Sequence, residues 1–218
     1  MSNSTRMLRR ILPSLSLFLA LLATLWPTPL PVHALSDPAE IPTLPAFSQT
    51  VQNGQKNTIR GIYVDEVLAL PVVQQPQSNP GFVSSKDNIV TQFRMASKYG
   101  NIGLLAHNHL AGRFFSYLTI GQEIELVYGD GRVETFIVTE VLAYQALSPN
   151  SPYSSFKNLE NGTTLNATQM FKRVYFGDRH VTLQTCIKAN GQASWGRLFI
   201  IAYPKEDIAS SSTLQLNQ

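Results

Sequence analysis

Cys186 is the only cysteine among the 218 residues of this chain, which excludes an intrachain disulfide. It lies in an apolar and β-branched stretch, residues 181–187, where period-two alternation puts Thr182, Gln184 and Cys186 on one face. The thiol therefore shares a face with polar side chains and points away from Leu183. A lone cysteine is most often a small buried apolar residue, and its strand position alone does not make Cys186 catalytic.

Two other residues could assist a thiol. His107 follows the apolar stretch 103–106, and Arg197 begins the last apolar stretch, eleven residues after Cys186, a spacing that fits one loop between antiparallel strands. A thiol that attacks an amide needs a base or ion-pair partner, and the resulting oxyanion needs a hydrogen-bond donor. Each residue also has a structural interpretation, as a hydrogen-bonded histidine and as a solvated arginine.

Together these residues resemble the sortase family. Residues 182–186 (TLQTC) match the sortase signature Thr-Leu-x-Thr-Cys, and Arg197 stands where the family has its arginine. Residues 107–118 (HNHLAGRFFSYL) are similar to the His-Asn-x-x-x-Gly-x-x-Phe-x-x-Leu stretch of class B sortases. The order histidine, cysteine, arginine agrees as well, and the resemblance extends over residues 58–203.

The resemblance implies a mainly β fold, an eight-stranded sortase-like barrel with one or two short helices. It also implies a cysteine transpeptidase in which Cys186 attacks the backbone carbonyl of a sorting motif, often Leu-Pro-x-Thr-Gly, and an amine releases the acyl-enzyme. His107 would be the general acid and then the base, and Arg197 would bind the oxyanion or the peptide backbone. Residues 144–179 would form the variable substrate-recognition loop.

Two departures from the family pattern leave alternatives open. Ala106 stands where sortases usually have glycine, and His109 competes with His107 because both would share a face on a strand; His180 is a weaker candidate. The sequence therefore leaves two alternative hypotheses open: a cysteine endopeptidase that uses water as acceptor, and an inactive sortase-like binding module. No zinc-ligand spacing or phosphate-binding glycine loop is present, and acidic residues are sparse in 144–179, so we expect neither a cofactor nor a metal.

The sequence patterns indicate the elements that would position these residues. Short strands are expected at 58–64, 67–70 (ended by Pro71), 103–106, 124–128, 133–142, 181–187 and 197–203, with a hairpin turn at 129–131. Apolar residues at helical spacing predict one long helix over 85–99, and Asn166 or Thr168 caps a short helix over 166–171.

The N-terminal segment has the layout of a secretory signal. Three arginines precede an apolar run over residues 11–26, and Val32-His33-Ala34 provides a small-residue cleavage site. We expect residues 1–34 to be a signal peptide cleaved after Ala34 or, alternatively, retained as a membrane anchor. A proline-rich linker over 35–57, a catalytic domain over 58–203 and a flexible tail over 204–218 follow.

Export and charge together limit the partners. Cleavage after Ala34 removes three arginines and leaves 14 Lys and Arg against 14 Asp and Glu, so the basic balance belongs to the signal. We therefore expect no nucleic-acid partner, and membrane contact only through an uncleaved N-terminal segment. The expected partners are an exported protein that carries a sorting motif and an amine of the cell envelope or of another subunit, in an extracytoplasmic, cell-surface or membrane-associated location.

Overall fold

The computed structural model describes residues 41–216, so the expected signal peptide and residues 35–40 of the expected linker lie outside the described residues. The strands of this part are β1 (Ile59–Val64), β2 (Leu68–Gln74), β3 (Val90–Phe93), β4 (Ile102–Leu105), β5 (Glu123–Tyr128), β6 (Val133–Ala146), β7 (Phe156–Asn158), β8 (Thr164–Leu165), β9 (Val181–Ala189) and β10 (Gln192–Pro204). The helices are α1 (Leu44–Val51), α2 (Arg94–Ser97), the 3₁₀ helix η2 (Ala111–Tyr117), α3 (Ala167–Tyr175) and α4 (Lys205–Leu216).

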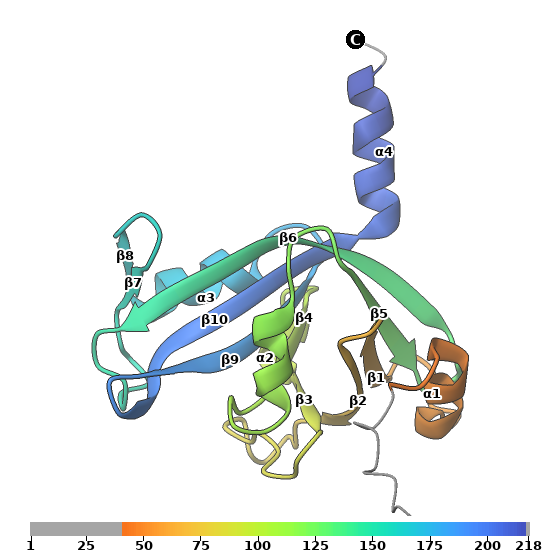
Figure 1. The fold of residues 1–218 in the computed structure, drawn as a ribbon, viewed down its shortest axis with the longest axis horizontal. Coiled ribbons are helices and arrows are strands. Elements are labelled where there is room, and N and C mark those ends of the chain that lie inside the picture. Colours follow the sequence, from red (N-terminus) through yellow and green to blue (C-terminus); the bar gives the residue numbers. More distant parts are fainter. Residues whose placement is uncertain (1–40, 217–218) are drawn as a thin grey trace, which may run out of the picture. The chain divides into compact units, whose positions relative to one another are not determined.

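Eight of these strands close into a barrel. The order is β10-β9-β4-β3-β2-β1-β5-β6, and the pairing of β6 with β10 closes the ring, while β7 and β8 extend the sheet beyond β6. Closure removes the free edges that an open sheet would expose. The barrel is visible in Figure 1, where β6 and β10 are the long curved neighbours. The predicted mainly β, eight-stranded fold is confirmed.

The barrel interior holds the main apolar core. Along β9, Val181 and Leu183 face inward, and along β10 the inward residues are Ile200 and Ala202, all of them fully buried. The alternate residues therefore face outward, because successive side chains of a strand point to opposite faces. This alternation places Cys186 and Arg197 on the outer face of the barrel.

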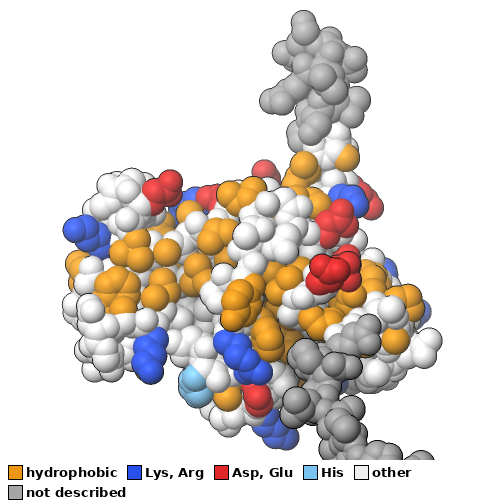
Figure 2. Space-filling model, viewed as in Figure 1, with side chains coloured by type: hydrophobic (Ala, Val, Ile, Leu, Met, Phe, Trp, Pro, Cys, Tyr) orange, Lys and Arg blue, Asp and Glu red, His pale blue; other side chains and the backbone are white. Residues whose placement is uncertain are grey.

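A second apolar layer covers part of that outer face. Met170, Val174 and Tyr175 of α3 pack with Phe199 and Ile201, the outward residues of β10. Figure 2 shows a further gathering of apolar side chains over the long strands β6 and β10. The outer surface of these strands is therefore itself a packing surface, and α3 occupies one part of it.

The predicted helix over 85–99 is wrong, because most of its residues are not helical. Asn88 has a left-handed rather than a helical backbone, with φ 56°, and strand β3 begins at Val90. The β-branched Val90 and Thr91 pair with β2 on one side, and β3 pairs with β4 on the other. Sheet closure overrides the helical spacing, and only α2 remains helical.

The expected boundaries of the domain also change. Helix α1 stands inside the expected linker, and its Phe47 and Val51 pack against Tyr63 and Val127 of the barrel. Gly61 permits this contact, since a Cβ there would lie 2.7 Å from the Phe47 ring. At the other end the backbone forms α4, where we expected an irregular tail, and two acidic residues in its first turn favour the helix N-terminus.

Two local predictions agree with the structure, and a third does not. The turn at 129–131 joins β5 to β6, with Gly131 at φ 88°. Asn166 caps α3 through a capping box with Gln169, although the helix continues beyond residue 171. Strand β2, in contrast, does not end at Pro71, and its pairing with β3 begins directly afterwards at Val72.

Asn101 connects α3 to the barrel. This side chain is 2% exposed, donates to the Tyr175 carbonyl at 2.9 Å and accepts from the His180 amide at 2.8 Å. Replacing Asn101 with alanine leaves both backbone groups without a partner and should lower the free energy of unfolding by about 2–4 kcal/mol. Urea denaturation measures this loss. The exposed Asn150→Ala control should stay within about 0.5 kcal/mol, and an equally small change in Asn101→Ala would contradict the assignment.

Candidate active site

Cys186 and Arg197 lie directly opposite one another in neighbouring strands. The antiparallel register of β9 and β10 pairs Cys186 with Arg197, one residue before the continuous pairing ends at Ile187 and Gly196. Residues paired in this way have Cβ atoms about 4.5–5.5 Å apart and point to the same face. The spacing of eleven residues predicted this neighbouring pair, and the register confirms that the two residues face each other.

His107 reaches the same level from the other side of β9. Strands β4 and β9 run parallel, with Leu105 opposite Gln184, and the Ala106 amide continues the pairing by donating to the Gln184 carbonyl at 3.2 Å. Two further residues along each chain bring His107 level with Cys186. Because adjacent strands lie about 4.8 Å apart, Cys186 has Arg197 on one flank and His107 on the other.

A tight turn fixes the backbone of His107. Its carbonyl accepts the amides of Leu110 and Gly112, both at 3.0 Å, and the Thr185 hydroxyl donates to the Ala106 carbonyl at 2.9 Å. Gly112 has no room for a side chain, because a Cβ would lie 2.2 Å from Thr185 Oγ1 and 2.8 Å from two carbonyl oxygens. Thr185 and Gly112 belong to the segments 182–186 and 107–118, and these contacts position the histidine.

Asn108 adds a link across the site. Its side-chain amide donates to the Ala193 carbonyl at 2.9 Å, which ties the histidine turn to the hairpin between β9 and β10. The roles of Asn108, Gly112 and Thr185 did not follow from the sequence, although all three belong to the segments that carried the resemblance. The contacts themselves span 79 to 85 residues, which local patterns do not reveal.

The two other histidines differ from His107 in their surroundings. His109 is exposed and lies in the turn after β4 rather than on a strand, with its ring centroid 5.6 Å from that of His107. His180 is 1% exposed, and both its ring nitrogens contact backbone carbonyls, those of Asp178 at 2.7 Å and Val174 at 3.0 Å. His180 is therefore engaged in holding α3, and His109 remains near the thiol.

Arg197 directs its guanidinium group to its own hairpin. Nη1 donates to the carbonyls of Ser194 at 3.0 Å and Gly196 at 2.8 Å. Among the residues that the structure describes, no hydrogen bond joins Cys186, His107 and Arg197 to one another. The three side chains are neighbours by strand register, and contact with a substrate would require Arg197 to exchange those carbonyl oxygens for substrate oxygens.

A small apolar cavity of about 170 Å³ adjoins the site. Gln184 and Arg197, which flank Cys186 on the outer face, both line it. The rest of its wall comes from α3, β10 and neighbouring segments: Phe93, Pro152, Phe156, Ala167, Met170, Phe171, Val174, Tyr175 and Phe199. Such a cavity suits an apolar side chain, with polar groups only at the end beside the thiol.

Helix α3 is hydrogen-bonded to β9 as well as packed on it. The Tyr175 hydroxyl donates to Gln184 Oε1 at 2.7 Å, and the Thr182 hydroxyl donates to the Val174 carbonyl at 2.5 Å. Burial raises the pKa of Tyr175, so this hydroxyl stays protonated and remains a donor. The outward residues of β9 before Cys186 are therefore both polar. Thr182 and Gln184 are each hydrogen-bonded to α3.

Within residues 41–216, no three His, Cys, Asp or Glu side chains lie together in a way that could hold a metal ion. None of the helices described there combines the length and apolar character that a membrane crossing requires.

Comparison with known proteins gives structural likenesses only. No protein-family model and no curated protein matches the sequence. Among solved structures, sortase A of Listeria monocytogenes is 17% identical with a TM-score of 0.44, over 68% of this chain and 88% of that one. Sortase C-1 of Actinomyces oris is 11% identical with a TM-score of 0.45, over 76% and 82%.

A sortase D5 transpeptidase of Clostridium perfringens is 12% identical with a TM-score of 0.40, over 73% of this chain and 87% of that one. The prediction of a sortase-like barrel agrees with these matches. None of the three is a class B sortase, so the class B likeness of the histidine segment stays a prediction. At such identities the likeness concerns the fold, and we take no residue role from it.

Gly112→Ala tests the close packing that positions His107. The new Cβ would overlap Thr185 Oγ1 and two carbonyl oxygens, so the free energy of unfolding should fall by about 1–3 kcal/mol. Denaturant unfolding measures the change, with Gly81→Ala as control because a Cβ there meets only one atom within 4 Å, at 3.8 Å. Equal stability of both variants would show that the turn is looser than described.

Proposed function

We propose that this chain is an exported cysteine transpeptidase of the sortase type. The observation that carries the proposal is the position of β9 between β4 and β10, which sets Cys186 between His107 and Arg197. A nucleophile on β9, a proton carrier just after β4 and a fixed cation on β10 are groups that acyl transfer can use. The free, half-buried thiol of Cys186 supports the same role.

In the acylation step, Cys186 Sγ attacks a backbone carbonyl carbon of the substrate as its thiolate. The carbonyl π electrons move to oxygen, and the guanidinium group of Arg197 stabilises the resulting oxyanion. The imidazolium of His107 donates its proton to the departing amide nitrogen as the C–N bond breaks. A thioester on Cys186 and a free amine remain, and His107 is neutral.

In the second step, neutral His107 accepts a proton from an incoming amine, which attacks the thioester carbonyl. The C–S bond breaks, a new amide forms, and the Cys186 thiolate and the imidazolium are restored, so no proton or electron is left over. Arg197 is charged throughout, because guanidinium does not lose its proton in proteins. The role of Arg197 is therefore electrostatic. Its guanidinium group would exchange the hydrogen bonds to the hairpin carbonyls for hydrogen bonds to the substrate oxygen.

The cavity under α3 supports a substrate with an apolar side chain close to the cleaved bond. Its aromatic and aliphatic walls favour a leucine-like group, and an extended peptide would then cross the ends of β9 and β10. A sorting motif of the Leu-Pro-x-Thr-Gly kind has this character. We accordingly propose an exported protein with such a motif as donor and an amine of the cell envelope or of another subunit as acceptor, in an extracytoplasmic location.

Mass spectrometry of the chain with a library of Leu-Pro-x-Thr-Gly-like peptides tests the nucleophile. An adduct with the mass of the acyl fragment should form on the wild-type chain and be absent from Cys186→Ala. Lack of an adduct with every peptide would contradict the proposal. His107→Ala should slow acyl-enzyme formation about 100-fold or more, whereas His109→Ala, the matched control, should retain most of the rate.

Arg197→Lys tests the oxyanion role. Lysine keeps the charge but loses the planar pair of donors, so the acylation rate should fall about 100-fold while the binding of a non-cleavable peptide changes little. Stopped-flow acylation and peptide titration separate these two effects. An unchanged rate in Arg197→Lys would remove the guanidinium group from the mechanism.

Product analysis with and without an added amine separates transpeptidation from hydrolysis. We expect the amine to appear in the product and to suppress the free acid, because the proposed acceptor is an amine. A hydrolysis product that does not respond to amine would indicate a cysteine endopeptidase. Failure of a thiol reagent to label Cys186 in the folded chain, with labelling after unfolding, would favour an inactive binding module instead.

A further inference from the structure

A second cavity lies at the barrel end opposite Cys186. It has a volume of about 320 Å³ and is lined by the first residues of two strands, Ile59 of β1 and Ile102 of β4. Cys186 lies toward the other end of β9, which runs parallel to β4. The two sites are therefore separated by the length of the barrel strands, and the mechanism above uses nothing at this end.

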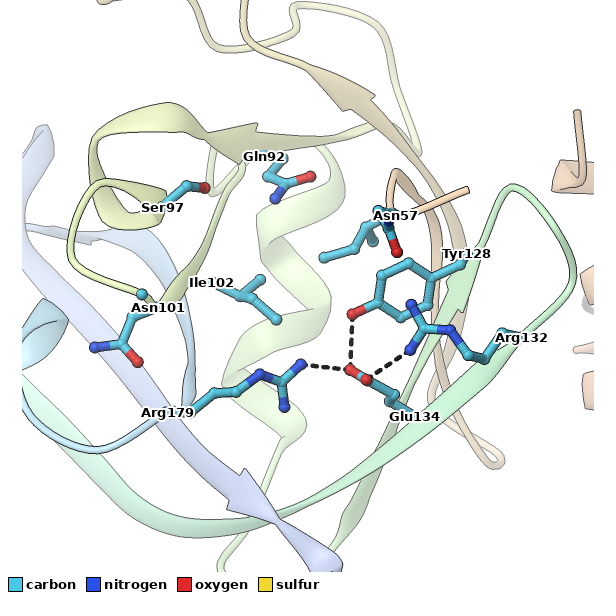
Figure 3. Close-up of a pocket in the computed structure, with 11 residues that line it drawn as sticks. Asn57, Gln92, Ser97, Asn101, Ile102, Tyr128, Arg132, Glu134 and Arg179 are labelled. Carbon is cyan, nitrogen blue, oxygen red and sulfur yellow. Dashed lines mark hydrogen bonds and ion pairs between the residues drawn. The ribbon is translucent and has the colours of Figure 1, made fainter. Parts of the chain in front are cut away.

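The cavity wall contains a carboxylate held by three donors. Glu134 accepts from the Tyr128 hydroxyl at 2.7 Å, from Arg132 at 2.6 Å and from Arg179 at 2.5 Å. Figure 3 shows the two guanidinium groups reaching Glu134 from opposite sides. Arg132 also stacks over the Tyr128 ring at 3.7 Å, and Arg179 lies 5.1 Å from the Phe136 ring, so both cations are fixed in place.

This cluster leaves one positive charge in excess. Burial raises the pKa of Glu134, but the hydrogen bond from Tyr128 and the hydrogen bond and charge of Arg179 outweigh it and hold that pKa below its ordinary value. The carboxylate is consequently ionised at neutral pH and balances one of the two guanidinium groups. Each guanidinium carries five N–H donors, and the recorded ion pairs with Glu134 engage one of them on each arginine. Donors and a unit of charge thus remain for an anion.

The opposite wall of the cavity presents an acceptor. Gln92 of β3 lines the cavity, and its Oε1 is buried with no hydrogen-bond partner in the part of the chain that the structure describes. Figure 3 places Gln92 across the opening from the arginines. A buried acceptor without a partner is destabilising, and an N–H group of a ligand would remove that cost.

From this arrangement we infer a binding site for a small carboxylate that carries an N–H donor next to it, as a free amino acid or a peptide carboxyl terminus does. The arginines bind the carboxylate, Gln92 Oε1 accepts the N–H group, and Ile59 and Ile102 form the apolar floor. A single excess positive charge matches a carboxylate better than a doubly charged phosphate. The site is independent of the chemistry proposed at Cys186.

Titration of the full chain by NMR, followed through the side-chain N–H signals of arginine and glutamine, tests this inference. The probes are glycine, N-acetylglycine, N-acetylglycine amide and inorganic phosphate. Glycine or N-acetylglycine should bind saturably at millimolar concentration or below, and the amide should not. Glycine alone would indicate an amino acid, and N-acetylglycine would indicate a peptide terminus.

Variants connect that binding to the named residues. Arg179→Gln and, separately, Gln92→Leu should each weaken binding of the acid at least about tenfold, with circular dichroism confirming the fold of each. Arg173→Gln, which removes a comparable exposed arginine from its pair with Glu140, should bind as the wild type does, and so should Cys186→Ala. No saturable binding, equal binding of the amide, stronger binding of phosphate, or unchanged binding in Gln92→Leu would each overturn the inference.

Discussion

The structure depends on one constraint, the position of strand β9 between a parallel and an antiparallel neighbour. β4 pairs with β9 in parallel, and β10 pairs with β9 in antiparallel fashion. The C-terminal ends of β4 and β9 therefore lie beside the part of β10 where its continuous pairing with β9 begins, at Gly196. Parallel pairing requires a long crossover between β4 and β9, and the chain supplies it with β5 to β8 and α3. His107 therefore comes to lie near Cys186 and Arg197, although it is far from both of them in the sequence.

Helix α3 both covers the outer face of β9 and β10 and encloses a cavity there. It covers the outward residues of β9 and β10, and hydrogen bonds from Tyr175 and Thr182 hold it there. The apolar cavity that adjoins Arg197 exists because α3 and the segment around Pro152 enclose the end of this face. Helix α3 thus covers apolar surface of the barrel and also determines the shape of the cavity beside the thiol.

The sequence predicted the barrel well because its strands alternate clearly, and because the turn at 129–131 and the cap at Asn166 have strong local signals. The prediction of a helix over 85–99 failed, although Ile89, Phe93 and Ala96 have helical spacing. Pairing with β2 and β4 makes residues 90–93 a strand, and the residues before it are not helical. Helix α1 was missed because prolines dominate its surroundings, although proline suits the first turn of a helix.

The candidate site was predicted in its residues and order but not in its support. Asn108, Gly112 and Thr185 act through contacts across 79 residues or more, or through the absence of a side chain, and neither is visible in periodicity. The cluster around Glu134 was missed in part for the same reason: Tyr128 and Arg132 lie beside Glu134 in the β5–β6 hairpin, but Arg179 joins them across 45 residues, through folding of the barrel.

A crystal structure of the chain with a sorting-motif peptide analogue joined to Cys186 would show which groups bind the acyl oxygen. We expect the peptide to occupy the cavity beneath α3, and the guanidinium group of Arg197 to leave the carbonyls of Ser194 and Gly196 and bind the carbonyl oxygen of the acyl group. We further expect His107, and not His109, to face the leaving-group side. An acyl oxygen bound by other donors, with Arg197 still on its own hairpin, would contradict the account.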